Sequence, residues 1–348
     1  MRVKLGDVCE RGSSNLKQSD VVEMKGDYPV YGASGCIGNA DFYHQENSYV
    51  AIVKDGAGIG RITLHPAKSS VIGTMQYLLP KNNVLPEYLY YVVSYMHLEK
   101  YFTGATIPHI YFKDYKNEEF NLDSVDMQKQ VVEVLGKCEA VIEGRKRELQ
   151  LLDDLIKARF VEMFGTLHDN ENGFEVVTIE DVCSLIKDGT HQTPQYTEDR
   201  EEGFKFLSSK DVMSQKIDWT DIKYIPAELH KKLYATIKPQ RNDILMSKNG
   251  VNYGVAAVND TDEVFDIYVS LALLRPKEII DPVFFRCVIN NPETKKQFDS
   301  SIKGIGVPNL HLGEIKKTKI FLPPMEFQKK FVAFVEQVDK SKVVEKNI

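Results

Sequence analysis

The chain has 348 residues, a formal net charge of -6 and a sequence pI near 5.8, so it is long enough for two domains and too acidic to coat nucleic acid by bulk charge. Its five cysteines are scattered and never spaced Cys-x-x-Cys, which argues against a disulfide framework or a zinc knuckle and favours a reducing cytosol. The first residues lack the apolar core of a signal peptide, and no apolar run approaches the roughly 20 residues that a membrane helix needs, so we expect a soluble cytoplasmic protein without membrane contact.

Both halves of the chain have the pattern of a mixed α+β module. In the first half, short β-rich runs lie at residues 49–53, 62–64 and 75–79, and a helix covers residues 87–95 behind Pro86. In the second half, the corresponding runs lie at residues 244–246, 255–258 and 267–274, and a helix covers residues 282–290. The fold class predicted for each module is therefore α+β.

A long helix is predicted between the two halves, over residues 127–165. Its apolar positions recur at alternating steps of four and three, which is a heptad seam, and at 1.5 Å per residue the helix is about 60 Å long. Asp123 or Ser124 can cap its start, and Gly165 closes it. By itself the pattern fits a helix packed inside one domain as well as a spacer. The seam consists of Val131, Leu135, Cys138, Ile142, Leu149, Leu152 and Ile156.

A sequence repeat relates the two halves. The segment that begins at residue 3 has a counterpart at residue 177, and the block at residues 49–61 has a counterpart at residues 243–255. The counterparts of residues 104–112 and 125–135 lie at residues 304–312 and 325–335, respectively. Because the blocks keep their order, we interpret the chain as a tandem duplication of one unit, a globular module followed by a helix.

The repeat defines four segments. They are a first module at residues 1–124, a central helix at 125–165, a second module at 166–324 and a distal helix at 325–348. The distal helix continues the seam with Phe331, Val335 and Val338, but Lys342 stands where the central helix has Ile142. The two helices are therefore unequal in length.

The glycine-rich segment at residues 56–60 has two interpretations. A strand followed by such a turn is how many nucleotide and methyl-donor sites begin, but those sites need a helix next. Here residues 61–66 continue with a β pattern, and the copy at residues 249–254 lacks the middle glycine. We therefore favour a β-hairpin turn over a cofactor site.

Catalytic and metal-binding motifs are missing from the sequence. The eight histidines are dispersed without a His-Glu-x-x-His motif, and neither Gly-x-Ser-x-Gly, Gly-Lys-Ser/Thr nor an Asn/Asp-Pro-Pro-Tyr/Phe segment occurs. We expect no catalytic residue and no metal site in this chain.

Polar and aromatic side chains on glycine-shaped loops are the remaining signal. Such groups suit contacts with base edges and phosphates, although ordinary turns capped by Asn, Ser and Thr explain any single loop equally well. The candidates in the first module are Lys54, Arg61, His65, Lys68, Thr106, His109 and Tyr111. Those in the second module are Lys187, Thr190, His191, Gln192, Thr193, Tyr196, Ser208, Ser209, Lys210, Lys248, Asn249, Asn252, Tyr253, Lys303, Asn309 and His311.

Three segments of the chain resemble the specificity (S) subunit of type I restriction-modification systems. They are residues 188–196 with 203–212, residues 243–254, and residues 320–330, and the resemblance runs nearly end to end. It implies that the two modules are target-recognition domains, each of which reads one half of a bipartite sequence in double-stranded DNA. It also implies that the two helices form an antiparallel coiled-coil spacer, which with a tandem repeat makes a pseudo-twofold particle.

The resemblance also implies the partners. The spacer helices would dock two modification (methyltransferase) subunits, and a restriction (endonuclease) subunit would complete the complex. Methyl transfer, ATP hydrolysis and cleavage, with S-adenosylmethionine, ATP and Mg, would belong to those subunits, and this chain would be non-catalytic and hold no cofactor. The family's distal helix normally matches the central one, so the shorter helix here implies a truncated subunit or a form completed by self-association.

Two other functions stay open from the sequence. One is a degenerate or truncated scaffold whose modules bind protein, which would leave no DNA footprint even with partner subunits present. The other is a self-sufficient DNA methyltransferase that uses the turn at residues 56–60, which would make the purified chain bind S-adenosylmethionine.

Overall fold

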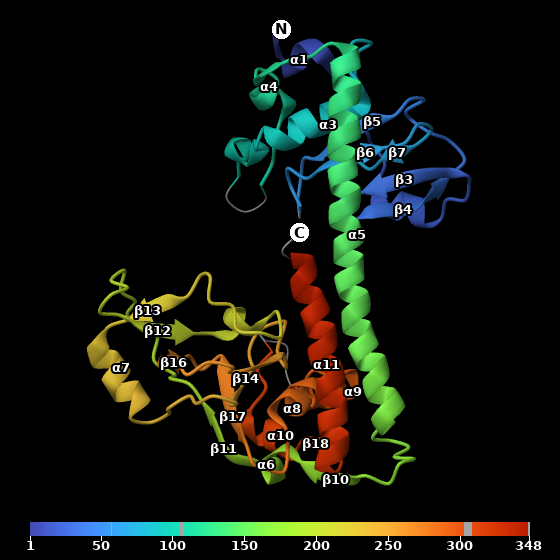
Figure 1. The fold of residues 1–348 in the computed structure, drawn as a ribbon. Coiled ribbons are helices and arrows are strands. Elements are labelled where there is room, and N and C mark those ends of the chain that lie inside the picture. The colour runs from blue at the N-terminus through green and yellow to red at the C-terminus, as the bar shows by residue number, and fades with distance from the viewer. Residues whose placement is uncertain (57, 105–107, 303–307, 347–348) are drawn as a thin grey trace. The chain divides into compact units, whose positions relative to one another are not determined.

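The structure is a computed structural model of the chain, and it describes residues 1–56, 58–104, 108–302 and 308–346 (Figure 1). Contacts within the chain divide it into two compact units, Met1–Gly144 and Arg145–Ile348. In the described ranges, every helix is too short or too polar to cross a bilayer.

The first unit is built from short strands and helices. Its strands are β1 (Arg2–Lys4), β2 (Cys9–Ser13), β3 (Tyr28–Gly32), β4 (Gly35–Ala40), β5 (Tyr49–Val53), β6 (Ile62–His65), β7 (Ser70–Val71), β8 (Met75–Pro80) and β9 (Glu119–Asn121). Its helices are α1 (Leu5–Val8), α2 (Gln18–Val22), α3 (Pro86–Tyr95), the 3-10 turn η1 (Leu98–Tyr101), α4 (Phe112–Tyr115) and the first half of α5 (Val125–Phe164). The strands form a four-stranded sheet of order β2-β8-β5-β6, a three-stranded sheet of order β4-β3-β7, and the pair β1-β9.

The second unit repeats this plan. Its strands are β10 (Glu175–Thr178), β11 (Cys183–Asp188), β12 (Phe204–Leu207), β13 (Lys223–Ile225), β14 (Ile244–Ser247), β15 (Ala256–Val258), β16 (Phe265–Ile267), β17 (Leu271–Pro276) and β18 (Lys319–Leu322). Its helices are the second half of α5, then α6 (Ile179–Val182), the 3-10 turn η2 (Ser209–Val212), α7 (Ala227–Tyr234), α8 (Pro282–Ile289), α9 (Pro292–Ser301), α10 (Leu312–Lys317) and α11 (Met325–Lys346). The sheets have the orders β11-β17-β14-β15, β13-β12-β16 and β10-β18.

The two units share one topology strand for strand. In each, the three-stranded sheet joins an antiparallel pair to one parallel partner, β7 beside β3 in the first unit and β16 beside β12 in the second. The predicted tandem duplication and the α+β class are therefore confirmed.

Central strands lie between two apolar cores in both units, which explains their continuous apolar sequence. Along β5, Val50 and Ile52 face the core under α3, while Tyr49 and Val53 face the core beneath β7. In β14, Ile244 and Leu245 likewise face different cores.

The long helix of the prediction is α5, which begins at Val125 and ends at Phe164. Ser124 caps its start, because the Met127 N–H points at the Ser124 hydroxyl oxygen at 3.4 Å. Gly165 ends it with a φ of +73°, a left-handed conformation that glycine adopts without strain.

Within the second unit, α11 lies alongside the second half of α5 and runs antiparallel to it (Figure 1). The direction is fixed by two contacts: Phe331 packs on Phe160 with ring centroids 5.5 Å apart, while Lys342 Nζ, further along α11, donates to Asp153 Oδ1 at 2.6 Å, earlier along α5. Arg159 adds a cation–π contact with Phe334 at 5.8 Å. The predicted antiparallel pairing of the two helices is therefore observed within this unit.

The predicted seam differs in burial along its length. Phe331, Val335 and Val338 are buried, and Ile156 packs against the same core. Leu149 and Leu152 are half-buried, and Val131 packs on the core of the first unit. By contrast, Leu135, Cys138 and Ile142 are exposed, so in this chain the middle of the seam has an apolar face open to solvent.

One predicted strand is two strands in the structure. The run at residues 267–274 divides between β16 and β17 at a turn through Val269 and Ser270, which the Leu271 N–H closes by donating to the Tyr268 carbonyl oxygen at 2.9 Å. Up to that turn the chain pairs with β12, since the Tyr268 N–H donates to the Leu207 carbonyl oxygen at 2.8 Å. Beyond it, β17 pairs with β11 and β14, so a change of partner sheet separates the two strands.

Gly56 and residues 58–60 lie in the turn of the β5–β6 hairpin, in which Ile52 pairs with Ile62. Gly56, Gly58 and Gly60 all have positive φ values, and a side chain at Gly60 would lie 2.6 Å from the Phe102 ring. The strand β6 follows instead of a helix, which confirms the hairpin interpretation.

A buried glutamine joins the long helix to the globular part in each unit. In the first unit, the Gln128 amide accepts a hydrogen bond from the Leu85 N–H at 2.9 Å and donates to the Asn83 and Asp123 carbonyl oxygens. In the second, the Gln328 amide accepts from the Asp281 N–H at 2.8 Å and donates to two carbonyl oxygens in the same way. These side chains fix the start of α3 and α8 against α5 and α11.

Candidate nucleic-acid interface

The β14–β15 turn of the second unit packs against the segment that precedes α10. The Gly250 N–H donates to the Pro308 carbonyl oxygen at 3.0 Å, and the Leu310 N–H donates to the Lys248 carbonyl oxygen at 2.7 Å. Asn249 and Asn309 face each other in an isolated antiparallel bridge. We call residues 248–250 together with residues 308–310 the second ledge. It brings together two loops whose candidate DNA-binding residues were predicted separately from the sequence.

The first unit has the same construction, which we call the first ledge, made of residues 54–56 with 108–110. The Ile110 N–H donates to the Lys54 carbonyl oxygen at 3.0 Å, and Asp55 and His109 form the isolated bridge. Beyond it, the ring of Tyr111 stacks near that of His109 with centroids 6.2 Å apart.

The side chains on the two ledges differ although their backbones correspond. Asp55 and His109 pair through His109 Nδ1 and Asp55 Oδ1 on the first ledge, whereas the second ledge carries the amides of Asn249 and Asn309 at the same places. Asn249 Oδ1 is buried without a hydrogen-bond partner among the described residues, so the exposed Asn309 amide is the group of the second ledge that is suited to a base edge, where the first ledge has an imidazole paired with a carboxylate.

Lys248 points into the second unit and not outward. Its ammonium is nearly inaccessible and donates to Asp188 Oδ2 at 2.8 Å, and His191 Nε2 lies 3.3 Å from the same oxygen. Desolvation is the largest single effect on Asp188 and opposes its ionisation, but the hydrogen bond and the positive charge of Lys248, with a smaller contribution from His191, together outweigh it and lower the pKa of that carboxyl group. Lys248 therefore holds the loop at residues 188–191 beside the second ledge, and the loop positions His191 at the surface.

The segment at residues 208–211 joins the same region through Ser270. Ser209 N–H donates to Ser270 Oγ at 3.0 Å, while the Ser270 carbonyl oxygen accepts from Lys248 N–H. The Ser208 N–H and hydroxyl both donate to Asp211 Oδ2 at the start of η2, and Lys210 Nζ donates to Asp221 Oδ2 at 2.7 Å. Ser208 and Ser209 therefore have structural hydrogen bonds, while Lys210 stays exposed.

A cleft of about 760 Å³ lies beside the first ledge, lined by Asp55, Gly56 and Arg61. Arg61 crosses its edge and donates from Nη1 to the Ala33 carbonyl oxygen at 2.7 Å. The other polar residues of this cleft were not predicted from the sequence, because they lie on loops without a repeated pattern. They are Asn15, Lys17, Gln18, Ser34 and Thr74.

Two of the predicted contact residues belong to the interior. His65 is 5% exposed, stacks on Tyr49 and shares a hydrogen bond with the Thr63 hydroxyl; desolvation lowers its pKa to about 4, so the ring is neutral at pH 7. Tyr253 is 8% exposed and donates its hydroxyl to Asp299 Oδ1. Burial therefore argues against a direct DNA contact by either ring, as it does for Lys248.

The remaining predicted residues divide by exposure. Thr190 is half-buried and forms an isolated β-bridge with Tyr268. Lys223 Nζ lies over the Tyr196 ring, 4.7 Å from the ring centroid. Thr106 and Lys303 lie outside the described residues. The exposed residues are Lys68, Tyr111, Lys187, Gln192, Thr193, Tyr196, Asn252 and His311.

Known proteins resemble this chain along most of its length. The family model described as "Type I restriction modification DNA specificity domain" matches residues 1–152 and 171–348. The MjaVIII specificity subunit of a type I restriction enzyme from Methanocaldococcus jannaschii is 24% identical over 323 residues, which cover 87% of this chain and 75% of that protein. The MjaIX specificity subunit from the same organism is 24% identical over 74% of this chain and 63% of its own length.

A solved structure shares the fold. The S subunit of a type I restriction-modification system from M. genitalium superposes with a TM-score of 0.59 at 14% identity, covering 100% of this chain and 91% of that one. The family match extends over both repeats and nearly all of the sequence. With its two copies of one module, each followed by a long helix, the chain belongs to the family of type I restriction-modification DNA specificity subunits.

Proposed function

We propose that each module of this chain reads one half of a bipartite target in double-stranded DNA, and that the ledges carry the base contacts. The observation that supports this is the pair of ledges: their backbones correspond, while Asp55 and His109 on one are replaced by Asn249 and Asn309 on the other. A duplicated scaffold with different hydrogen-bonding groups at equivalent places is suited to two different half-sites.

We propose that methyl transfer, ATP hydrolysis and DNA cleavage take place on partner subunits. The chain is a non-catalytic subunit that works in the cytoplasm, docks two modification subunits on its helices and joins a restriction subunit. S-adenosylmethionine, ATP and Mg are bound by those partners. Family membership supports this division, and the exposed apolar seam at Leu135 and Ile142 is suited to a docking helix.

Exchange of the first module tests the proposal. Residues 1–124 are replaced by the equivalent segment of another specificity subunit, and methylated sites are mapped across the genome of cells that also carry the cognate modification subunit. We expect a split motif in which one half changes and the other half stays. An unchanged motif, or a change in both halves, would contradict the assignment of one half-site to each module.

A single substitution on the second ledge is expected to act on one half-site alone. Asn309→Ala removes an exposed amide, and a bidentate amide–adenine contact is worth about 1 to 3 kcal/mol of discrimination. We expect relaxed specificity in the half assigned to the second module, measured by competition binding of the assembled complex to DNA variants. Asn82→Ala, an exposed asparagine on a turn of the first unit, is the matched control and should leave both halves unchanged.

A further inference from the structure

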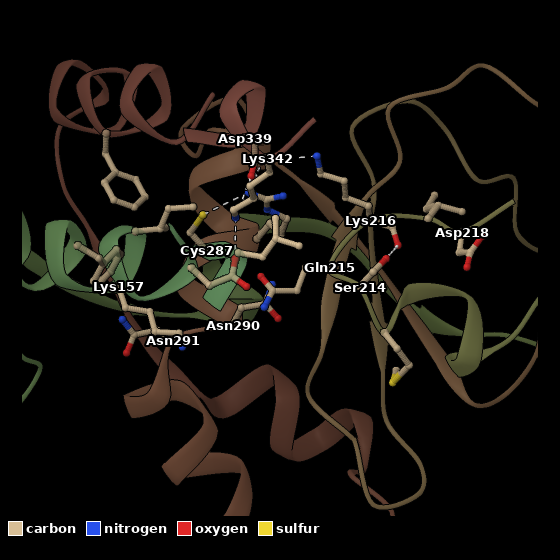
Figure 2. Close-up of a pocket in the computed structure, with 18 residues that line it drawn as sticks. Lys157, Ser214, Gln215, Lys216, Asp218, Cys287, Asn290, Asn291, Asp339 and Lys342 are labelled. Carbon is tan, nitrogen blue, oxygen red and sulfur yellow. Dashed lines mark hydrogen bonds and ion pairs between the residues drawn. The ribbon is translucent and has the colours of Figure 1, made fainter. Parts of the chain in front are cut away.

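A second cavity lies in the second unit, away from the ledges. It has a volume of about 610 Å³ and is enclosed by α5, α8, α11 and the loop at residues 213–218 (Figure 2). Cavities of about 300 to 1,000 Å³ are typical of sites for small organic ligands. Its size alone therefore admits a molecule larger than a simple ion.

A buried arginine with unused hydrogen-bonding capacity faces this cavity. Arg286, on α8, is 8% exposed, and its Nε is buried without a hydrogen-bond partner among the described residues. Nη2 of Arg286 lies 3.6 Å from Asp339 Oδ2 and donates to the Cys287 sulfur at 3.7 Å. A buried N–H without an acceptor is costly, so this group favours an anion supplied from outside.

Two more cations converge on the same place. Lys342 Nζ lies 3.1 Å from Asp339 Oδ1 and 2.6 Å from Asp153 Oδ1, and Lys216 reaches toward Asp339 from the opposite loop at 3.9 Å (Figure 2). Among the lining residues that the structure describes, four cations stand against three carboxylates. Desolvation raises the pKa of the Cys287 thiol, which stays protonated and adds no negative charge.

Besides the polar side chains of Ser214, Gln215, Asn290 and Asn291, the lining includes apolar side chains on the helices and the loop, which form an apolar wall. A flat, apolar ligand body can pack there, because aromatic and aliphatic side chains gather along that wall. They are Leu149, Ile156, Phe160, Met213, Ile217 and Phe331.

The corresponding positions of the first unit are built differently. By the repeat, Tyr90 and Tyr91 on α3 correspond to Arg286 and Cys287, and Glu139 corresponds to Asp339. There, Tyr91 donates its hydroxyl to Glu139 Oε2 at 2.8 Å, which ties α3 to α5 with a neutral donor. The buried cation is thus a feature of the second copy and not a requirement of the shared fold.

We propose that this cavity is a binding site for a nucleoside monophosphate or a similar phosphorylated ring compound. The phosphate group occupies the space before Arg286 and accepts from Nε, with Lys216 and Lys342 supplying further positive charge. The ring lies against the apolar wall formed by α5 and α11. This site is separate from DNA reading, and its test uses no DNA.

The test is calorimetric titration of the full chain with AMP, with adenosine and with inorganic phosphate. We expect AMP to bind with a Kd below about 1 mM and at least about tenfold more tightly than either of the other two, because only AMP fills both parts of the cavity. Arg286→Met should weaken AMP binding at least about tenfold, and Lys216→Gln, on an exposed loop, should weaken it severalfold without risk to folding.

Lys231→Gln is the matched control, since Lys231 is exposed on α7 and lies outside the cavity. It should bind AMP like the unmodified chain. Absence of AMP binding, equal binding of adenosine, or unchanged binding in both Arg286→Met and Lys216→Gln would overturn the proposal. Each of these outcomes leaves the proposal about the ledges untouched.

Discussion

Replacing Gln328 with leucine is expected to lower the free energy of unfolding of the second unit by about 3 to 5 kcal/mol. The side chain is inaccessible to solvent and makes three hydrogen bonds, with the Asp281 N–H at 2.8 Å and with the Ile279 and Pro323 carbonyl oxygens at 3.1 and 2.8 Å. Leucine has a similar volume but leaves all three backbone groups without this partner, and the Pro323 carbonyl oxygen lies in a buried position. Urea unfolding followed by circular dichroism measures the loss.

Gln337→Leu on the same helix is the matched control, because Gln337 is exposed and the change should alter the free energy of unfolding by less than about 0.5 kcal/mol. The repeat supplies an internal check. Gln128→Leu should destabilise the first unit by a similar amount, since Gln128 is equally buried and makes the equivalent three bonds. A loss below about 1 kcal/mol in both units would show that these amides do not hold the helices in place.

Phe331→Ala is expected to cost about 3 to 5 kcal/mol and to loosen α11 from α5. Phe331 is fully buried in an aromatic cluster, with ring centroids 5.5 Å from Phe160, 5.6 Å from Phe164 and 6.1 Å from Phe284. The truncation opens a cavity where α5, α8 and α11 meet, and these rings cannot collapse into it together. Hydrogen exchange should then show faster exchange of the amides in α11.

Phe327→Ala, one helical turn earlier, is the control for that change. Phe327 is 39% exposed and contacts Phe174 at a centroid distance of 5.7 Å, so its loss should cost about 1 kcal/mol and leave exchange in the rest of α11 unchanged. Equal effects of the two substitutions would mean that the aromatic cluster is not what fixes α11 on α5.

Local sequence signals predicted the regular elements well. The heptad spacing over residues 127–165 corresponds to α5, and the glycines at residues 56–60 correspond to a hairpin turn, because helix periodicity and positive φ values are properties of short segments. The order of the repeated blocks predicted a duplication that the sheet orders confirm. Each of these features depends on residues that lie within about 40 positions of one another in the chain, or on the recurrence of such a segment.

The candidate site was predicted less completely. Lys54, His109, Asn249 and Asn309 were predicted as separate loop residues, and only the fold brings the first two together on the first ledge and the last two together on the second. Asp55 was not predicted, although it occupies the position of the repeat that is equivalent to Asn249 and could have been identified in that way. His65 and Lys248 read as polar surface residues, yet both are buried: the His65 ring stacks on Tyr49, and the Lys248 ammonium donates to Asp188, which is 60 residues away in sequence.

By itself, then, the sequence determined the secondary structure, the duplication and the family of this protein. Only the tertiary structure decided which polar side chains face outward, that the run at residues 267–274 splits into two strands, and that Arg286 meets Asp339 beside a cavity. The physical reason is that periodicity and turn conformation are local, whereas burial and hydrogen-bond partnership depend on segments brought together from far apart in the chain.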